Sequence, residues 1–231
     1  MDNTQKIKWG IIGAGIIAKK MANALKITPN CQLCAVASKT PSKARMFADE
    51  NGVENAYNYQ EIVNSKEIDV IYVATTHNFH FDNAKLALKH GKHVLIEKSF
   101  TVNANEAREL VRIALEKNLF LMEAMWTRFL PHILKVQQMI NDGLIGQPRI
   151  LQASVGDQKE LDPSNRFFNP KLGGGSLIDV GIYAATLAHL IFGPPTAIQT
   201  LANLSSTGKG NSQQILQLFL MAQLLAGEDE Q

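Results

Sequence analysis

The feature that most constrains this chain is a strand, a glycine turn and a helix near the amino terminus. Residues 8–12 form a short apolar run typical of a buried strand, and Gly13, Gly15 and Ala18 follow it in the pattern G-x-G-x-x-A. Gly13 permits a tight turn, Gly15 leaves room for a pyrophosphate against the backbone, and Ala18 lets the next helix pack closely. Glycine turns also occur where nothing binds, but the strand before and the helix after this one predict a dinucleotide-binding unit.

Strands and helices alternate regularly over residues 1–123. The predicted strands after the first are 33–37, 56–57, 68–74, 92–96 and 119–122. The predicted helices are 16–26, 41–52, 59–64, 81–90 and one capped by Asn103 and Glu106 that reaches 117. This spacing is typical of βαβ units, so we predict an α/β fold, a Rossmann doubly wound parallel sheet, over residues 1–123.

The pattern changes in residues 124–231. We expect helices at 131–141 and 176–192 and strands at 149–155 and 197–202, and the apolar run 215–226 is helix-like because it lacks alternation. The second part is therefore predicted to be an incomplete α+β domain.

Composition argues against nucleic acid, a membrane and a metal ion as partners of this chain. The formal net charge of the 231 residues is +2, and no basic tract suggests nucleic acid. No apolar segment reaches the length of a membrane span and no signal-peptide core follows the first residues, so we expect a cytoplasmic protein. Cys31 and Cys34 form a C-x-x-C without a second ligand pair, so we expect ordinary strand residues and no metal.

The end of the second strand predicts the cofactor. Folds that select NAD place an acidic residue there, about twenty residues after the glycines. This chain has Ser38 and Lys39, followed by Lys43 and Arg45, which favours NADP over NAD. Alternatively, Lys43 and Arg45 lie on the exposed face of the next helix, which Thr40 would cap. Lys39 is the stronger candidate for the 2′-phosphate.

Lys98 follows a predicted strand at the carboxyl edge of the sheet, where ligands of such folds bind. A partly desolvated lysine is suited to proton transfer or to polarising a hydroxyl, and Glu97 offers a carboxylate to a ribose hydroxyl or to the lysine. The alternative is a surface salt bridge, and position alone favours neither.

Asp179 and Tyr183 are four residues apart on a predicted helix and so share one face. A nearby lysine would favour the phenolate of Tyr183, which suits proton exchange with a substrate hydroxyl. However, Ser176 and Asp179 also fit a helix-capping pattern, and Tyr183 also fits a ring at a domain boundary. Spacing leaves both interpretations open.

Four motifs in order resemble the glucose-fructose oxidoreductase and inositol dehydrogenase family, Gfo/Idh/MocA. They are residues 13–18, 75–80, 91–98 and 173–183. The segment 121–131 is similar to the branch with NADP-dependent dimeric dihydrodiol and D-xylose dehydrogenases.

The resemblance implies an NADP-dependent oxidoreductase that transfers hydride between the nicotinamide and a secondary hydroxyl or carbonyl of a sugar or trans-dihydrodiol. It implies that Lys98 lies beside the nicotinamide and the reacting hydroxyl, that Tyr183 is the proton donor or acceptor, and that Asp179 supports it. Asn78 and His80 are implied near the nicotinamide.

Motif positions and resemblance together give a set of expected cofactor contacts. These are Gly13, Gly15, Ile16, Ile17, Ser38, Lys39, Lys43, Thr75, Asn78, His80, Glu97, Lys98, Trp126 and Arg128.

Two departures from the family pattern matter. Ser99 stands where the family usually has proline, so the backbone constraint that helps aim Lys98 is missing. Members of the family normally continue into an open sheet that lines the substrate site and often forms the dimer interface. The ending of this chain lacks the pattern of that sheet, so we expect a truncated or frame-altered product and doubt that the dimer forms. The rival hypothesis is therefore a non-catalytic NAD(P)-binding module or an inactive fragment, and NAD(P)-assisted elimination or hydrolysis is a third.

Overall fold

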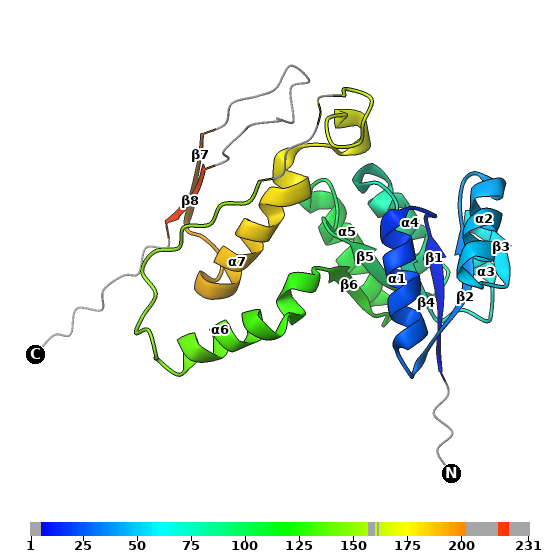
Figure 1. The fold of residues 1–231 in the computed structure, drawn as a ribbon, viewed down its shortest axis with the longest axis horizontal. Helices are drawn as coiled ribbons and strands as arrows, with labels where there is room; N and C mark the ends of the chain where they lie inside the picture. Colours follow the sequence, from blue (N-terminus) through cyan, green and yellow to red (C-terminus); the bar gives the residue numbers. More distant parts are fainter. Residues whose placement is uncertain (1–5, 157–159, 161, 202–216, 222–231) are drawn as a thin grey trace, which may run out of the picture. The chain divides into compact units, whose positions relative to one another are not determined.

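The computed structural model describes residues 6–156, 160, 162–201 and 217–221 (Figure 1). The chain divides into two compact units, Met1–Met125 and Trp126–Gln231.

The first unit is built on one parallel sheet of six strands. They are β1 (Ile7–Ile12), β2 (Cys31–Ala37), β3 (Asn55–Tyr57), β4 (Val70–Val73), β5 (His93–Glu97) and β6 (Leu121–Ala124). The strand order is β3-β2-β1-β4-β5-β6, which is the doubly wound arrangement predicted from the sequence. The order reverses between β1 and β4, so the crevice between their carboxyl ends is where such a fold binds its ligand.

Five α-helices cover this sheet. They are α1 (Ile16–Ile27), α2 (Pro41–Asn51), α3 (Tyr59–Asn64), α4 (His80–Lys89) and α5 (Ala104–Glu116), and a 3-10 turn, η1 (His77–Phe79), precedes α4. Helices α1 and α2 pack on one face, around Val36 and Tyr72, and helices α3, α4 and α5 pack on the other, around Ile71 and Val73. The strand residues alternate between these two cores, because successive side chains of a strand point to opposite faces.

The predicted elements of this unit are present, with ends that differ by about two residues. The predicted cap of α5 is confirmed, since the Asn103 side chain accepts a hydrogen bond from the Glu106 backbone N–H. Ala18 is fully buried in the α1 core, as its small size predicts.

The second unit contains two longer helices and a strand pair. Its elements are η2 (Trp126–Phe129), α6 (Pro131–Asn141), η3 (Pro170–Leu172), the π-helical turn η4 (Leu177–Gly181), α7 (Ile182–Phe192), β7 (Ala197–Leu201) and β8 (Gln217–Met221). Strands β7 and β8 are antiparallel (Figure 1).

Two sequence predictions for this unit are wrong. Residues 149–155 form no strand: among the described residues no other strand pairs with them, and Ile150 is 88% exposed, so β propensity alone does not hold them. Within the run 215–226 the described residues 217–221 are strand β8 and not helix, because backbone pairing with β7 outweighs the missing alternation. In the parts of the chain that the structure describes, no helix is long and apolar enough to cross a membrane.

Candidate active site

The glycine turn joins β1 to α1 at the carboxyl edge of the sheet. Gly13 has φ +111°, and a Cβ there would lie 2.7 Å from the Ala74 carbonyl oxygen, so only glycine fits. A Cβ at Gly15 would meet no atom within 4 Å, so the space beside that backbone is open. The turn therefore has both properties that the motif predicts for pyrophosphate binding.

Helix α1 begins at this turn. Gly15 is the N-cap and makes no side-chain cap, and the first turn carries no acidic residue. Ile16 is 84% exposed and Ile17 is 38% exposed, so apolar side chains flank the helix start. Helix N–H groups and the positive end of the dipole are suited to an anion.

Lys39 lies two residues after the end of β2. Lys39 Nζ lies 4.0 Å from the centre of the Phe79 ring, a cation–π contact that holds the ammonium beside η1. Ser38 Oγ accepts a hydrogen bond from the Thr40 backbone N–H, whereas Thr40, the N-cap of α2, makes no side-chain cap of its own.

The two later cations, Lys43 and Arg45, lie on helix α2. Arg45 pairs with Asp49 on the same exposed helix face, with 2.5 Å between Nη2 and Oδ1, as the alternative interpretation of the sequence expected. Lys43 also lies exposed on α2. Lys39 lies closest to the end of β2 in the sequence and contacts Phe79 of η1, so it stays the predicted ligand of the 2′-phosphate.

Lys98 follows β5 directly, and Glu97 is the last residue of that strand. The Tyr72 hydroxyl, from the adjacent strand β4, donates to Glu97 Oε1, and the Lys98 backbone N–H donates to Glu97 Oε2 over 3.1 Å. Burial raises the pKa of the Glu97 carboxyl, and burial and the neighbouring Glu97 raise the pKa of Tyr72. Glu97 is thus a fixed carboxylate that orders the backbone entering Lys98.

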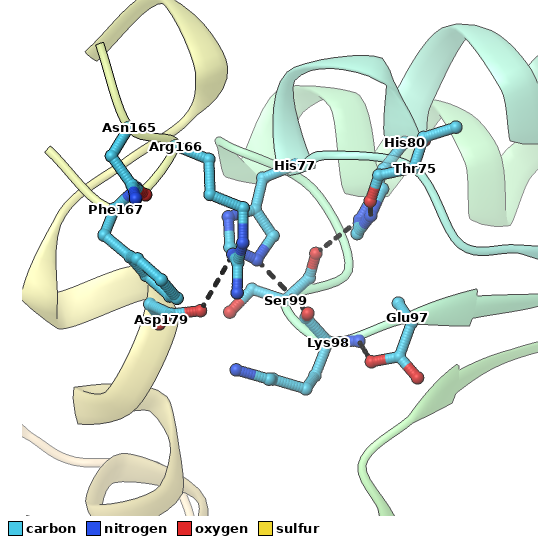
Figure 2. Close-up of polar contacts among 10 residues, drawn as sticks. All are labelled: Thr75, His77, His80, Glu97, Lys98, Ser99, Asn165, Arg166, Phe167 and Asp179. Carbon is cyan, nitrogen blue, oxygen red and sulfur yellow. Dashed lines mark hydrogen bonds and ion pairs between the residues drawn. The ribbon is translucent and has the colours of Figure 1, made fainter. Parts of the chain in front are cut away.

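Two histidines follow β4 and contact the backbone of the Lys98 segment (Figure 2). His77 Nε2 lies 3.2 Å from the Lys98 carbonyl oxygen, and His80 Nδ1 lies 2.8 Å from that of Ser99. His80 is fully buried, and its Nε2 lies 3.0 Å from the Thr75 carbonyl oxygen. These contacts place the His80 ring inside the protein.

Thr75 and Asn78 line the same loop and are half-buried. Thr75 Oγ1 accepts a hydrogen bond from Asn83 Nδ2, and the Asn78 side-chain oxygen accepts one from Thr76 Oγ1 over 2.7 Å. These bonds fix the conformation of the loop at the edge where a nucleotide would bind.

In the second unit, Trp126 and Tyr183 contact each other. Trp126 Nε1 donates to the Tyr183 hydroxyl oxygen over 3.2 Å, and the two rings meet edge to face with centroids 5.9 Å apart. Arg128 is exposed in η2.

Asp179 lies in the π-helical turn and pairs with Arg166 (Figure 2), with 3.3 Å between Oδ1 and Nη1. The Arg166 guanidinium also stacks 4.0 Å from the Phe167 ring centre. Ser176 makes no side-chain cap, so the capping interpretation of Asp179 is wrong. Gly174 packs against this loop: a Cβ there would lie 2.4 Å from the Arg166 carbonyl oxygen.

Sequence reasoning missed four residues at these positions: Tyr72, His77, Phe79 and Arg166. Tyr72 reads as one more apolar strand residue, and Arg166 lies in a loop whose partner is distant in the sequence. His77 and Phe79 fall inside the 75–80 motif, so their place next to Asn78 and His80 was the available signal.

Both cysteines lie in strand β2, as the sequence predicts. Cys31 and Cys34 are free thiols, and burial raises the pKa of the Cys34 thiol, which disfavours the reactive thiolate. Over the described residues, no group of three or more His, Cys, Asp or Glu side chains is placed to hold a metal ion.

Comparisons with known proteins agree with this geometry. Residues 7–125 match the model of the oxidoreductase family with an NAD-binding Rossmann fold, GFO/IDH/MocA, and residues 133–221 match the GFO/IDH/MocA C-terminal domain. Trans-1,2-dihydrobenzene-1,2-diol dehydrogenase of Bos taurus is 35% identical over 207 residues, which is 87% of this chain and 61% of that protein. D-xylose 1-dehydrogenase (NADP(+)) of Hypocrea jecorina is 38% identical, over 80% of this chain and 52% of that protein.

A solved structure with the same fold is KijD10, a 3-ketoreductase from Actinomadura kijaniata, in complex with NADP and TDP-benzene. It has a TM-score of 0.77 and 29% identity, over 85% of this chain and 60% of that one. Aldose-aldose oxidoreductase from Caulobacter crescentus, complexed with glycerol, has a TM-score of 0.81 and 25% identity, over 87% and 62%.

The fold and the glycine turn define a nucleotide-binding Rossmann protein with a second α+β unit. The chain belongs to the GFO/IDH/MocA oxidoreductase family, as its motifs predict. It spans 61% of the bovine relative and 52% of the fungal one.

Proposed function

We propose that this protein is an NADP-dependent dehydrogenase that acts on a secondary hydroxyl, or on the corresponding carbonyl, of a sugar or trans-dihydrodiol. The observation that carries the proposal is the carboxyl edge of the sheet, where the open Gly15 turn, Lys39 and Lys98 follow strands β1, β2 and β5. The relatives named above, dihydrodiol and xylose dehydrogenases, support this class of substrate.

The residues present fit NADP. The α1 N-terminus and the space at Gly15 suit the pyrophosphate, and Ile16 and Ile17 offer apolar contact beside it. Lys39 has no carboxylate beside it at the end of β2 in the sequence, so a 2′-phosphate meets a cation there. When bound, the cofactor supplies hydride transfer at its nicotinamide.

The roles of the chain's own groups follow from their chemistry. Lys98 would stabilise the oxyanion that develops as the substrate hydroxyl loses its proton. Tyr183 would take that proton, with Trp126 Nε1 hydrogen-bonded to its oxygen and Asp179 in support, which are the roles that the family resemblance implies for the second unit. Glu97 and Asn78 would order the loops at the nicotinamide side.

The proposal is tested by turnover of NADP⁺ or NADPH with a panel of sugars, trans-dihydrodiols and their oxidised counterparts. We expect activity with members of one panel, and a loss of about 100-fold or more in kcat for Lys98→Met with a smaller change in NADPH affinity. NADPH binding without turnover on any panel member would instead support a cofactor-binding module, the rival hypothesis. The cytoplasmic location and the oligomeric state stay predictions.

A further inference from the structure

The contacts between the β4 and β5 ends provide a way to hold Lys98. Strands β4 and β5 are neighbours in register, with Val73 beside Ile96, so the chain segments that leave them lie side by side. Lys98 is two residues past Ile96. A side chain that follows β4 and hydrogen-bonds the backbone after β5 therefore influences the position of Lys98.

His77, the first residue of η1, and His80, the first residue of α4, both contact this backbone. The two rings meet edge to face, with centroids 5.4 Å apart and an interplanar angle of 83°. Their nitrogens contact the successive carbonyl oxygens of Lys98 and Ser99, at 3.2 and 2.8 Å. Both histidines are buried, with 6% and 0% of the residue exposed.

The ring of His80 faces backbone carbonyls on both sides. Both ring nitrogens lie within hydrogen-bond distance of backbone carbonyls, those of Ser99 and Thr75. Burial lowers the pKa of His80 to about 4, so the ring is neutral at pH 7 and has a single N–H to donate. One N–H can serve only one of the two carbonyls, and we assign it to Nδ1 because the contact with the Ser99 carbonyl is the shorter one.

We propose that His80, together with His77, is a positioning residue for Lys98: the two imidazoles bind the carbonyls of Lys98 and Ser99 and fix the direction in which the Lys98 side chain leaves β5. This inference rests on the proposed function, since it gives Lys98 the catalytic role. Ser99 has no ring to restrict its φ, so side-chain hydrogen bonds take over the constraint that a proline would supply at this position. A lysine displaced by about 1 Å from the reacting hydroxyl would lose much of its effect on the rate.

The two contacts use different ring nitrogens, which allows a crossed test. An asparagine amide nitrogen lies where Nδ1 of histidine does, and a glutamine amide nitrogen lies where Nε2 does. His80→Asn therefore keeps the donor to Ser99 and His80→Gln loses it, whereas at His77 glutamine keeps the donor to Lys98 and asparagine loses it. We expect kcat to fall about 10- to 100-fold in His80→Gln and His77→Asn. It should fall clearly less in the two conserving variants, with NADPH affinity little changed in all four.

A second measurement separates positioning from general stability. In a Lys98→Ala background, where the positioned group is absent, His80→Gln should lower kcat no further. Amide exchange of residues 97–101 should speed up in His80→Gln and less in His80→Asn, a result that needs no turnover. His90→Gln is the matched control, because His90 Nδ1 also lies 2.8 Å from a backbone carbonyl, that of Leu86, at the far end of α4.

The outcomes are distinct. If the unaltered protein turns over no substrate, the proposed function fails, and the amide-exchange result still decides whether the histidines hold the segment. Equal losses in the asparagine and glutamine variants, a loss that persists without Lys98, or weakened NADPH binding with unchanged kcat would each overturn the positioning role. If the His80 variants do not fold, the His77 pair gives the same comparison.

Discussion

The two glycines of the nucleotide turn have opposite surroundings. Gly13 is enclosed by backbone at positive φ, while Gly15 faces open space. The fold therefore requires the first glycine and the proposed ligand requires the second.

This difference predicts the results of two matched substitutions. Gly13→Ala should destabilise the protein by about 2 kcal/mol or more, because its Cβ would clash with the Ala74 carbonyl. Gly15→Ala should leave the melting temperature within about 2 °C and weaken NADPH binding about tenfold or more. Thermal unfolding and fluorescence titration measure both. A Gly15→Ala variant that binds NADPH normally would contradict the role of this turn.

His80 also predicts a pH dependence of stability. In the unfolded chain it takes up a proton near its ordinary pKa of 6.5, but the buried ring, next to His77, does so only near pH 4. The unfolded state therefore binds more protons in this window, so the free energy of unfolding falls as pH decreases from about 6.5 to 4, by on the order of 3 kcal/mol. Urea unfolding at several pH values should show this slope, and His80→Asn should lose most of it. An unchanged slope in the variant would assign the effect to other groups.

At the scale of elements, β4 and β5 are joined by side chains as well as by backbone pairing. The Tyr72 hydroxyl donates to the partly buried Glu97 carboxylate at the carboxyl end of β5. This bond ties the strand that leads to the histidines to the strand that leads to Lys98.

Tyr72→Phe should therefore lower the free energy of unfolding by about 1–3 kcal/mol, because the partly buried Glu97 carboxylate loses its side-chain hydrogen-bond donor. Tyr57→Phe, in the edge strand β3 and only half-buried, is the control and should cost less. Denaturant unfolding measures both. Equal effects of the two substitutions would contradict a special role for the Tyr72 bond.

The turn before η4 depends on a close backbone approach. Gly174 lies against the carbonyls of Arg166, Phe167 and Asn169, which would be 2.4 to 2.9 Å from an added Cβ. Gly174→Ala should displace this loop, break the pair between Arg166 and Asp179, and lower the melting temperature by several degrees, about 2–4 °C per kcal/mol lost. Gly156→Ala, where a Cβ meets nothing within 4 Å, should change little. Similar melting temperatures for the two variants would show that the approach is not needed.

At the scale of the whole molecule, the sequence predicted the first unit better than the second. Its strands are covered on both faces and alternate with helices, so local pattern and tertiary fold agree. In the second unit, whether residues 149–155 and 217–221 form strands depends on whether another segment pairs with them. A local sequence pattern does not encode that pairing partner. The same reason hid the contacts of Arg166 with Asp179 and of Tyr72 with Glu97, since each partner lies far away in the sequence.

The central claim is that the Rossmann unit binds NADP through the Gly15 turn and Lys39. The most direct test is titration of the full chain with NADPH and with NADH, followed by quenching of tryptophan fluorescence, in the unaltered protein and in Lys39→Asp. We predict tight NADPH binding, NADH binding weaker by about tenfold or more, and loss of this preference in Lys39→Asp. The claim would be contradicted if neither nucleotide binds. It would also be contradicted if NADPH and NADH bind equally well and Lys39→Asp does not change their affinities.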